Sequence, residues 1–328
     1  MNTLKIRFKE FFMLWKNYSF VYACYSILWW FCFYTRPPFC NKISTLAINK
    51  KTKWLDKYFS HRYKDIIEKY NDRQADTKPI DKAHIWVFWG QGEENMPPLV
   101  RACYRQLKHH NDNVQLLTNY NVKDFIELPE VVTQKVKTGQ ISWAFFSDIV
   151  RNSVLAKHGG LWVDATTWIP QRIPVEDFMK YKFISPSEKT ISNNRSVCFW
   201  STFDWNWNGW CMWSNRKNYI IFSFVADMLI EVTKKEKVIP DYVTIDYLIY
   251  LAIRKFPEIH EDLEKAKEIQ CNKRHQMALM MNEAYDENKY KELIKDNFIF
   301  KLSFRANWHK TTKKGKQTFY GRILENFI

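Results

Sequence analysis

The chain has 328 residues and 46% of them are hydrophobic, enough to fill the core of one large domain or two ordinary ones, so intrinsic disorder is excluded. Its 50 Lys and Arg residues against 35 Asp and Glu residues leave a formal charge of +15, which favours nucleic acid, anionic lipid or a small anion as partner without choosing among them. Aromatic residues make up 17% of the chain, and this favours stacking platforms or a membrane interface beyond ordinary core packing.

The first notable segment, residues 17–35, carries no charge and is mostly apolar or aromatic. As a helix it would be about 28 Å long, close to the roughly 30 Å of bilayer hydrocarbon. Its Tyr and Ser residues suit headgroup depth better than the bilayer centre, and basic residues flank it on both sides. We therefore expect a helix lying in the surface of an anionic membrane. A true membrane span and a helix packed on the rest of the protein are the alternatives.

The elements that follow predict an α/β domain. Residues 54–70 favour a helix, and residues 71–82 a polar connector. Residues 84–89 form a short apolar run ended by Gly90-Gln91-Gly92, as expected for a buried parallel strand. A helix opened by Pro97-Pro98 and a strand at residues 114–117 would complete a βαβ start.

A longer helix is expected at residues 143–157, directly before the strand that carries Asp164. Ser142 would cap it, Trp143, Phe146, Val150 and Val154 would face the core, and Gly159-Gly160 would end it. A minimal strand at residues 161–163 then delivers Asp164 at its carboxyl end, where ligands bind in open α/β sheets. Further elements are expected along the rest of the chain: a helix at 130–137, strands at 183–185 and 197–200, an aromatic patch at 199–213, helices at 219–233 and 243–256, a charged and mostly helical region at 258–295, and a strand at 298–304.

Three residues of this region suit a sugar nucleotide. Asp164 can hold a divalent ion on the diphosphate, and Asp148 and Arg151, one helical turn apart, can grip sugar and phosphate. Trp89 or Trp86 can stack on the base. Each also has an ordinary structural interpretation: a solvated ion pair for Asp148 and Arg151, a turn cap for Asp164, and core packing for both Trp residues.

Four motifs together resemble the capsular polysaccharide synthesis proteins, which are related to glycosyltransferase family 32 and to the retaining, GT-A-fold enzymes with a DXD motif. The motifs are IWVFWGQG at 85–92, AFFSDIVR at 144–151, HGGLWVDAT at 158–166 and KLSFR at 301–305. The resemblance covers roughly residues 80–310. It implies a GT-A-like, Rossmann-type mixed sheet flanked by helices, and a nucleotide-sugar-dependent transferase.

The resemblance also implies roles for single residues. Asp164 resembles the DXD ligand of Mn²⁺ or Mg²⁺, although the motif here is Asp164-Ala165-Thr166, so Thr166 or a water would replace the second carboxylate. Asp148 and Arg151 resemble the pair that contacts the donor sugar and phosphate. Trp89, with Gly90 in the turn after it, resembles the platform for the base. Lys301 resembles a late basic residue near the leaving diphosphate.

Other residues are weaker candidates. His309 is a possible second metal ligand. Asp246 and Asp204 are candidates for contact with the acceptor, and both are equally plausible as structural groups. The aromatic patch at 199–213 would form either sugar-stacking subsites or core under a lid. Retention at the anomeric carbon is expected from the resemblance alone.

The sequence thus predicts three regions: a helical, aromatic and basic membrane-associating segment at 1–75, a catalytic domain at 80–310 and a basic tail at 311–328. Its seven cysteines lack disulfide or zinc spacing and indicate a reducing compartment. We expect a UDP-hexose donor, a lipid-linked glycan acceptor, and a place on the cytoplasmic face of the plasma membrane. A nucleic-acid partner is not expected. The alternatives are a nucleic-acid-binding module and a Golgi-type enzyme with a membrane anchor.

Overall fold

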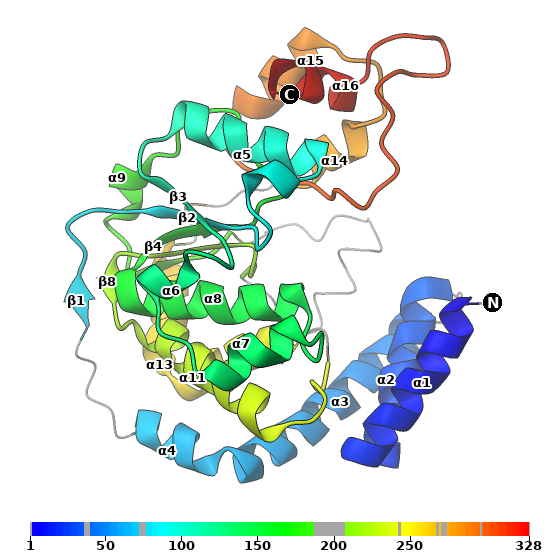
Figure 1. Cartoon of the computed structure of the whole chain (residues 1–328), viewed down its shortest axis with the longest axis vertical. Helices are drawn as coiled ribbons and strands as arrows, with labels where there is room; N and C mark the ends of the chain where they lie inside the picture. Colours follow the sequence, from blue (N-terminus) through cyan, green and yellow to red (C-terminus); the bar gives the residue numbers. More distant parts are fainter. Residues whose placement is uncertain are drawn as a thin grey trace.

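The computed structural model describes residues 2–35, 40–71, 77–186, 207–241, 244–266, 269, 274–295 and 297–327. At its centre is a five-stranded mixed sheet in the order β3-β2-β4-β7-β6, of which strands β2, β3 and β4 can be followed in Figure 1. Its strands β2 (Ile85–Phe88), β3 (Val114–Leu117) and β4 (Gly160–Val163) are parallel, whereas β7 (Cys211–Ser214) and β6 (Phe183–Ile184) are antiparallel additions. The mixed α/β architecture expected from the sequence is confirmed.

Side chains alternate between the two faces of the sheet, as the twofold period of a strand requires. Ile85 and Val87 of β2 pack with α5 (Pro98–His110), which connects β2 to β3. Trp86 and Phe88 point to the other face and pack with α8 (Trp143–His158) and α11 (Ile220–Lys235). The predicted βαβ start is therefore present, and helices cover both faces of the sheet.

The helix α8 begins and ends where the sequence predicts. Ser142 Oγ accepts a hydrogen bond from the backbone N–H of Phe145 at 3.1 Å. Gly159 and Gly160 follow the helix with φ of 65° and 93°, and a Cβ on Gly160 would lie 2.5 Å from the carbonyl oxygen of His84. Glycine is therefore required where the chain turns from helix to strand. The expectation that Trp143 faces the core is wrong: it is 38% exposed, because its ring lies beside Gly90 and lines a cavity.

Smaller elements complete this domain. Helices α12 (Thr244–Lys255) and α13 (Pro257–Lys265) extend the layer of α11, and α14 (Gln276–Met280), α15 (Glu287–Lys295) and α16 (Phe319–Phe327) gather near α5. Residues 311–328, expected as a basic tail, thus include a helix with buried Phe319, Ile323 and Leu324. The remaining elements are short: β1 (Lys78–Pro79), which pairs with β8 (Arg216–Lys217), η1 (Glu93–Asn95), α6 (Val122–Phe125), α7 (Glu130–Lys137), α9 (Val175–Phe178), and β5 (Thr167–Trp168), which pairs with β9 (Phe300–Lys301).

Two expected strands have a different outcome. The strand expected at 298–304 shortens to the two residues of β9, because its partner β5 offers only two residues to pair with. The strand expected at 197–200 lies outside the described residues. The strand β7 was not predicted, because its first three residues, 211–213, were included in the aromatic patch.

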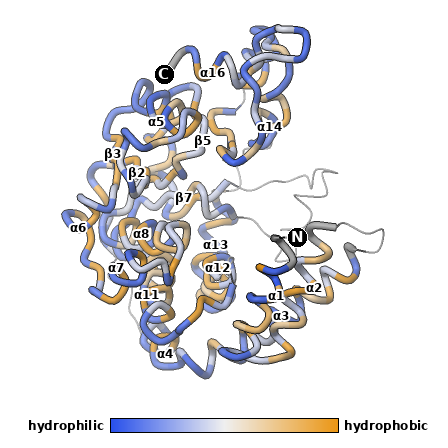
Figure 2. The backbone as a smooth tube through the Cα atoms, turned by 45° about the vertical axis from the view of Figure 1, so that its right-hand side comes forward, coloured by the Kyte–Doolittle hydropathy of each residue, from blue (hydrophilic) through white to orange (hydrophobic). Residues whose placement is uncertain are grey.

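Four N-terminal helices precede the sheet: α1 (Asn2–Asn17), α2 (Phe20–Thr35), α3 (Cys40–Arg62) and α4 (Lys64–Asn71). The charge-free segment is mostly α2, which packs against both α1 and α3. Within the described residues, no helix combines the length and apolar character that crossing a bilayer requires. One side of α2 buries Tyr22 and Cys32, and the other leaves Phe20, Val21 and Phe31 exposed. Figure 2 shows hydrophobic stretches along α1 and α2 at the edge of the molecule.

The N-terminal helices are tied to the rest of the chain around the loop after α11. The hydroxyls of Tyr58 and Tyr63 donate to Glu236 Oε1 at 2.8 and 2.6 Å, and Tyr22 donates to the carbonyl of Pro240 at 3.0 Å. Lys51 forms a buried ion pair with Asp241. The apolar side chains of α3 and α4 join the same core cluster as α8, α11 and α12. This segment and the sheet domain therefore share one core.

Candidate active site

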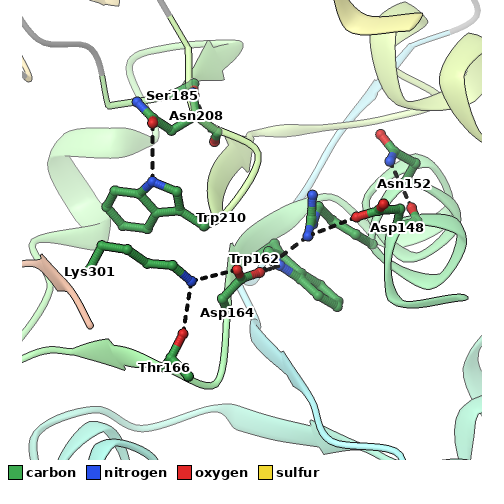
Figure 3. A network of polar contacts seen from close by, with 10 residues as sticks. Asp148, Asn152, Trp162, Asp164, Thr166, Ser185, Asn208, Trp210 and Lys301 are labelled. Carbon is green, nitrogen blue, oxygen red and sulfur yellow. Dashed lines mark hydrogen bonds and ion pairs between the residues drawn. The ribbon is translucent and has the colours of Figure 1, made fainter. Parts of the chain in front are cut away.

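The centre of the site is the carboxylate of Asp164, directly after β4 (Figure 3). Its Oδ2 accepts a hydrogen bond from Lys301 Nζ at 2.7 Å. Its Oδ1 accepts from Arg151 Nη2 at 3.2 Å and from the indole Nε1 of Trp162 at 3.1 Å. Trp162 lies two residues before Asp164, so the strand brings both side chains to one face. One strand end thus gathers a carboxylate, a guanidinium and an ammonium.

Arg151 connects this strand end to helix α8. Its Nη2 also lies 3.2 Å from Asp148 Oδ1, one helical turn earlier, and the guanidinium is 5.3 Å from the centre of the Trp162 ring. The side chain is buried, and a Cβ at Gly209 would come within 2.9 Å of its Nη1. The spacing of Asp148 and Arg151, predicted from the sequence, therefore produces a pair that faces Asp164 instead of a solvated surface pair.

Lys301 reaches the same point from β9, 137 positions after Asp164. In the β5–β9 ladder Lys301 lies opposite Thr167, and its Nζ donates to Thr166 Oγ1 at 2.8 Å as well as to Asp164. The ring of Trp210 lies 5.8 Å from the ammonium. The second and third motifs of the sequence thus meet the fourth at one cluster, which is hereafter called the strand-end network: Asp148, Arg151, Asp164, Thr166 and Lys301.

Burial and charge shift the carboxyl groups of the site in opposite directions. Burial raises the pKa of Asp148 to about 7, against the opposing charge of Arg151. Burial also raises the pKa of Asp246 to about 7, and the charge of Asp148 adds to the rise. For Asp164, burial alone would raise the pKa, but Lys301 and Arg151 outweigh it and the pKa lies below its usual value. Near neutral pH Asp164 is therefore ionised, while Asp148 and Asp246 hold protons part of the time.

The strand-end network lines a cavity of about 1330 Å³, large enough for a sugar nucleotide. Aromatic side chains line part of the cavity: Trp89 and Phe304 meet edge to face at 5.7 Å, and Trp143 lies beside Gly90. Trp210 and Asp246 line it as well. On another side the wall comes from the N-terminal segment, with Glu10, Met13 and Leu14 of α1 and the loop at 237–241.

The two candidate base platforms are separated by the structure. Trp86 is 1% exposed, and its Nε1 donates to the carbonyl of Gly159 at 2.8 Å, so it is core and its candidacy is corrected. Trp89, three positions later, is half-buried and lines the cavity. Gly90 lines it too, and a Cβ there would lie 2.8 Å from the Trp143 ring. Trp86 lies within β2 and points into the core, whereas Trp89 follows the last residue of the strand and lies at the cavity.

The expected metal ligands are not brought together. His309 is exposed and does not line the cavity, and its backbone N–H donates to Asn282 Oδ1 at 2.9 Å, so the structure does not bring it to Asp164. Asp164 and Thr166 do share a face, but Lys301 lies between their oxygens. Across the described residues, no three His, Cys, Asp or Glu side chains form a group able to hold a metal. The residues present therefore do not fit the divalent ion that the resemblance implies.

The remaining candidates have mixed outcomes. Asp204 lies outside the described residues, as does most of the aromatic patch. Of its described members, Trp213 and Trp207 are buried and Trp210 is half-buried at the cavity. Sequence reasoning included Trp210 through this patch, but it missed Arg274 and the α1 residues as parts of the cavity wall. Nothing in the sequence signals them, because each reaches the site through contacts between distant segments.

A sequence model of the family described as capsular polysaccharide synthesis protein matches residues 38–323. The match includes every residue of the strand-end network, whereas α1 and α2 precede it. No curated protein matches the chain. The resemblance carried by the four motifs is therefore confirmed.

Proposed function

We propose, on the premise that this chain belongs to the capsular polysaccharide synthesis protein family, that it is a nucleotide-sugar-dependent glycosyltransferase. The observation that carries the proposal is the strand-end network: two carboxylates and two cations converge within one cavity that aromatic rings also line. A nucleotide sugar presents the matching parts, namely an anionic diphosphate, sugar hydroxyls and a flat base. We propose a UDP-hexose as donor.

Each chemical group of the donor has side chains in the cavity that can bind it. Lys301 and Arg151 supply positive charge for the diphosphate, and Asp148 is placed beside them to accept hydrogen bonds from sugar hydroxyls. Trp89 and Phe304 form the aromatic corner for the base, and the absence of a side chain at Gly90 leaves room for Trp143 beside it. Asp164 holds the two cations in position.

In the proposed reaction the bond between the anomeric carbon and the diphosphate oxygen breaks, and its electron pair stays with the UDP. An acceptor hydroxyl oxygen forms the new bond to that carbon and loses its proton to the leaving phosphate oxygen. Lys301 and Arg151 stabilise the negative charge that grows on the diphosphate. Attack from the same face, with retention, and the GT-A class of the sheet are parts of the proposal that rest on the family resemblance.

The acceptor side of the cavity supports a lipid-linked substrate. Asp246 lies on this side as a candidate contact for the acceptor hydroxyl, and Met13 and Leu14 of α1 provide an apolar wall. The outer surface of α1 exposes Ile6, Phe8, Phe12 and Trp15 together with Lys5, Lys9 and Lys16. Exposed rings interleaved with lysines suit an anionic membrane surface. We therefore propose that α1 and α2 rest on the cytoplasmic face of the membrane and bring the cavity to its acceptor.

The direct test is a screen of nucleotides and nucleotide sugars against the purified chain. We expect UDP and one UDP-hexose to raise the melting temperature, since a ligand that binds only the folded state stabilises it. Release of UDP from that UDP-hexose would then report turnover. The proposal is overturned if no nucleotide or nucleotide sugar raises the melting temperature and none is hydrolysed.

A further inference from the structure

Lys301 lies where a divalent ion of a DXD-type transferase would be expected. Its Nζ is 2.7 Å from Asp164 Oδ2 and 2.8 Å from Thr166 Oγ1, the two oxygens that the motif offers to a metal. We propose that the ammonium of Lys301 replaces the divalent ion, so that the chain binds the donor diphosphate without a metal. This inference rests on the proposed function, because it concerns the same donor.

The surroundings of Asp164 do not provide a coordination shell. Mg²⁺ requires about six oxygen ligands at roughly 2.0–2.1 Å. Asp164 Oδ2 already bonds to Lys301, and its Oδ1 accepts from both Arg151 and Trp162. Thr166 has a hydroxyl where a second carboxylate would be needed. An added ion would therefore have to displace an ammonium and remain next to a guanidinium.

The balance of charge also favours an anion over a cation. The strand-end network contains two cations, Lys301 and Arg151, and two acids, Asp148 and Asp164. Its net charge is zero when Asp148 is ionised and one positive charge when Asp148 is protonated. Arg274, buried and also lining the cavity, adds a further cation on the Lys301 side, whereas the other acids of the cavity wall, Glu10, Asp241 and Asp246, come from α1, the loop after α11 and α12. A dianionic diphosphate placed against Lys301 and Arg151 lowers the electrostatic energy, whereas a divalent cation in the same place raises it.

Lys301 is held for this role by both its backbone and its neighbours. Its backbone N–H donates to the carbonyl of Arg274 at 2.8 Å, and the next residue, Leu302, donates to the carbonyl of Thr166 at 3.0 Å. The ammonium lies 5.8 Å from the centre of the Trp210 ring. Because the side chain is partly exposed in the cavity, its ammonium can bond to a phosphate oxygen while Asp164 still balances its charge.

The test measures UDP affinity by calorimetry in excess EDTA and again with Mn²⁺ or Mg²⁺. For the unaltered chain we expect the two dissociation constants to agree within about twofold. Lys301→Met keeps the length of the side chain and removes its charge, so UDP should bind about 10–100-fold more weakly, and Mn²⁺ should not restore the affinity. Lys301→Arg keeps the charge and should retain most of the affinity. Lys313→Ala, an exposed lysine outside the cavity, is the matched control and should change nothing.

The outcomes separate this inference from the proposed function. UDP binding that appears only with Mn²⁺ or Mg²⁺ would overturn the role given to Lys301 and leave the transferase proposal standing. Unchanged affinity in Lys301→Met would overturn it as well. If no nucleotide binds under any condition, both proposals fail. A melting curve of Lys301→Met without ligand shows whether the variant is folded, and Lys301→Arg gives a second measurement if it is not.

Discussion

The strand-end network and the outer face of α1 differ in how they are built. In the network, five side chains from three distant parts of the chain contact one another within 2.7–3.2 Å. On α1, large apolar side chains such as Phe8 and Phe12 are 59% and 54% exposed. The family match includes the first region and excludes the second. In the network, a change in one side chain should abolish most of the activity, because each charge depends on the others for its position. On α1, binding should depend on the total apolar area, so each substitution should weaken it by a limited amount.

The largest expected effect is that of Asp164→Asn, which removes one charge and keeps the shape. Arg151 and Lys301 lose the carboxylate that positions them, so their alignment with the diphosphate is lost. We expect turnover of the UDP-hexose identified in the screen to fall by at least about 100-fold. The measurement is the rate of UDP release at saturating donor.

Asp177→Asn is the matched control for this variant, because Asp177 on α9 is 63% exposed and pairs only locally, with Lys180. It should keep full turnover. If Asp164→Asn keeps more than about a tenth of the wild-type turnover, Asp164 does not hold the two cations in place for the reaction.

The second effect is on membrane binding. The variants are Phe8→Asp and Phe12→Asp. The two residues lie one turn apart on the exposed side of α1, and neither lines the cavity. Burial of one such ring contributes roughly 1.5–3 kcal/mol, so each change should weaken binding to anionic vesicles about 10–100-fold, and the two together should weaken it further. Co-sedimentation with phosphatidylglycerol vesicles at increasing salt measures this effect, while hydrolysis of soluble donor should not change.

Tyr120→Asp provides the comparison for these variants. Tyr120 is 72% exposed and lies two residues before α6, a helix on the opposite side of the molecule from α1 (Figure 1). It should leave vesicle binding unchanged. Equal losses from all three substitutions, or no loss from the α1 pair, would show that α1 is not the membrane-binding face.

Local patterns predicted much of the fold because their causes are local. The apolar run of β2, the Ser142 cap and the Gly159-Gly160 turn each act within a few residues, and these boundaries agree with the sequence to within one or two positions. The same holds for the Asp148–Arg151 pair, because i and i+3 share a helix face. The direction in which a single ring points was less predictable. Trp86, a candidate for stacking on the base, is buried in the core, and Trp143, expected in the core, is exposed. Apolar character does not specify which side of an element meets the core.

The contact of Lys301 with the expected metal ligands could not be predicted, for a different reason. Thr166 and Lys301 were both identified, but their contact depends on β9 pairing with β5 across 135 positions. Two-residue strands leave almost no periodic signal, so the sequence could not indicate that the lysine enters the space between the Asp164 and Thr166 oxygens. The N-terminal wall of the cavity was missed likewise, because α1 reaches it only through the packing of α2 and α3.

The smallest expected effect concerns stability and distinguishes Asp246, beside the strand-end network, from Asp164 within it. The pKa of Asp246 is raised to about 7 by burial, so the native state keeps its proton where the unfolded chain has already released it, above about pH 4. Between these values the native state binds more protons, and the free energy of unfolding falls as pH rises.

The variant Asp246→Asn cannot ionise and therefore does not lose this stability. Because solvent in the cavity screens part of the effect, we expect a gain of roughly 1–2 kcal/mol above pH 7, and almost none near pH 4. Melting temperatures of both proteins from pH 4 to 8.5 measure the difference, and an equal shift at every pH would show that Asp246 is not the titrating group.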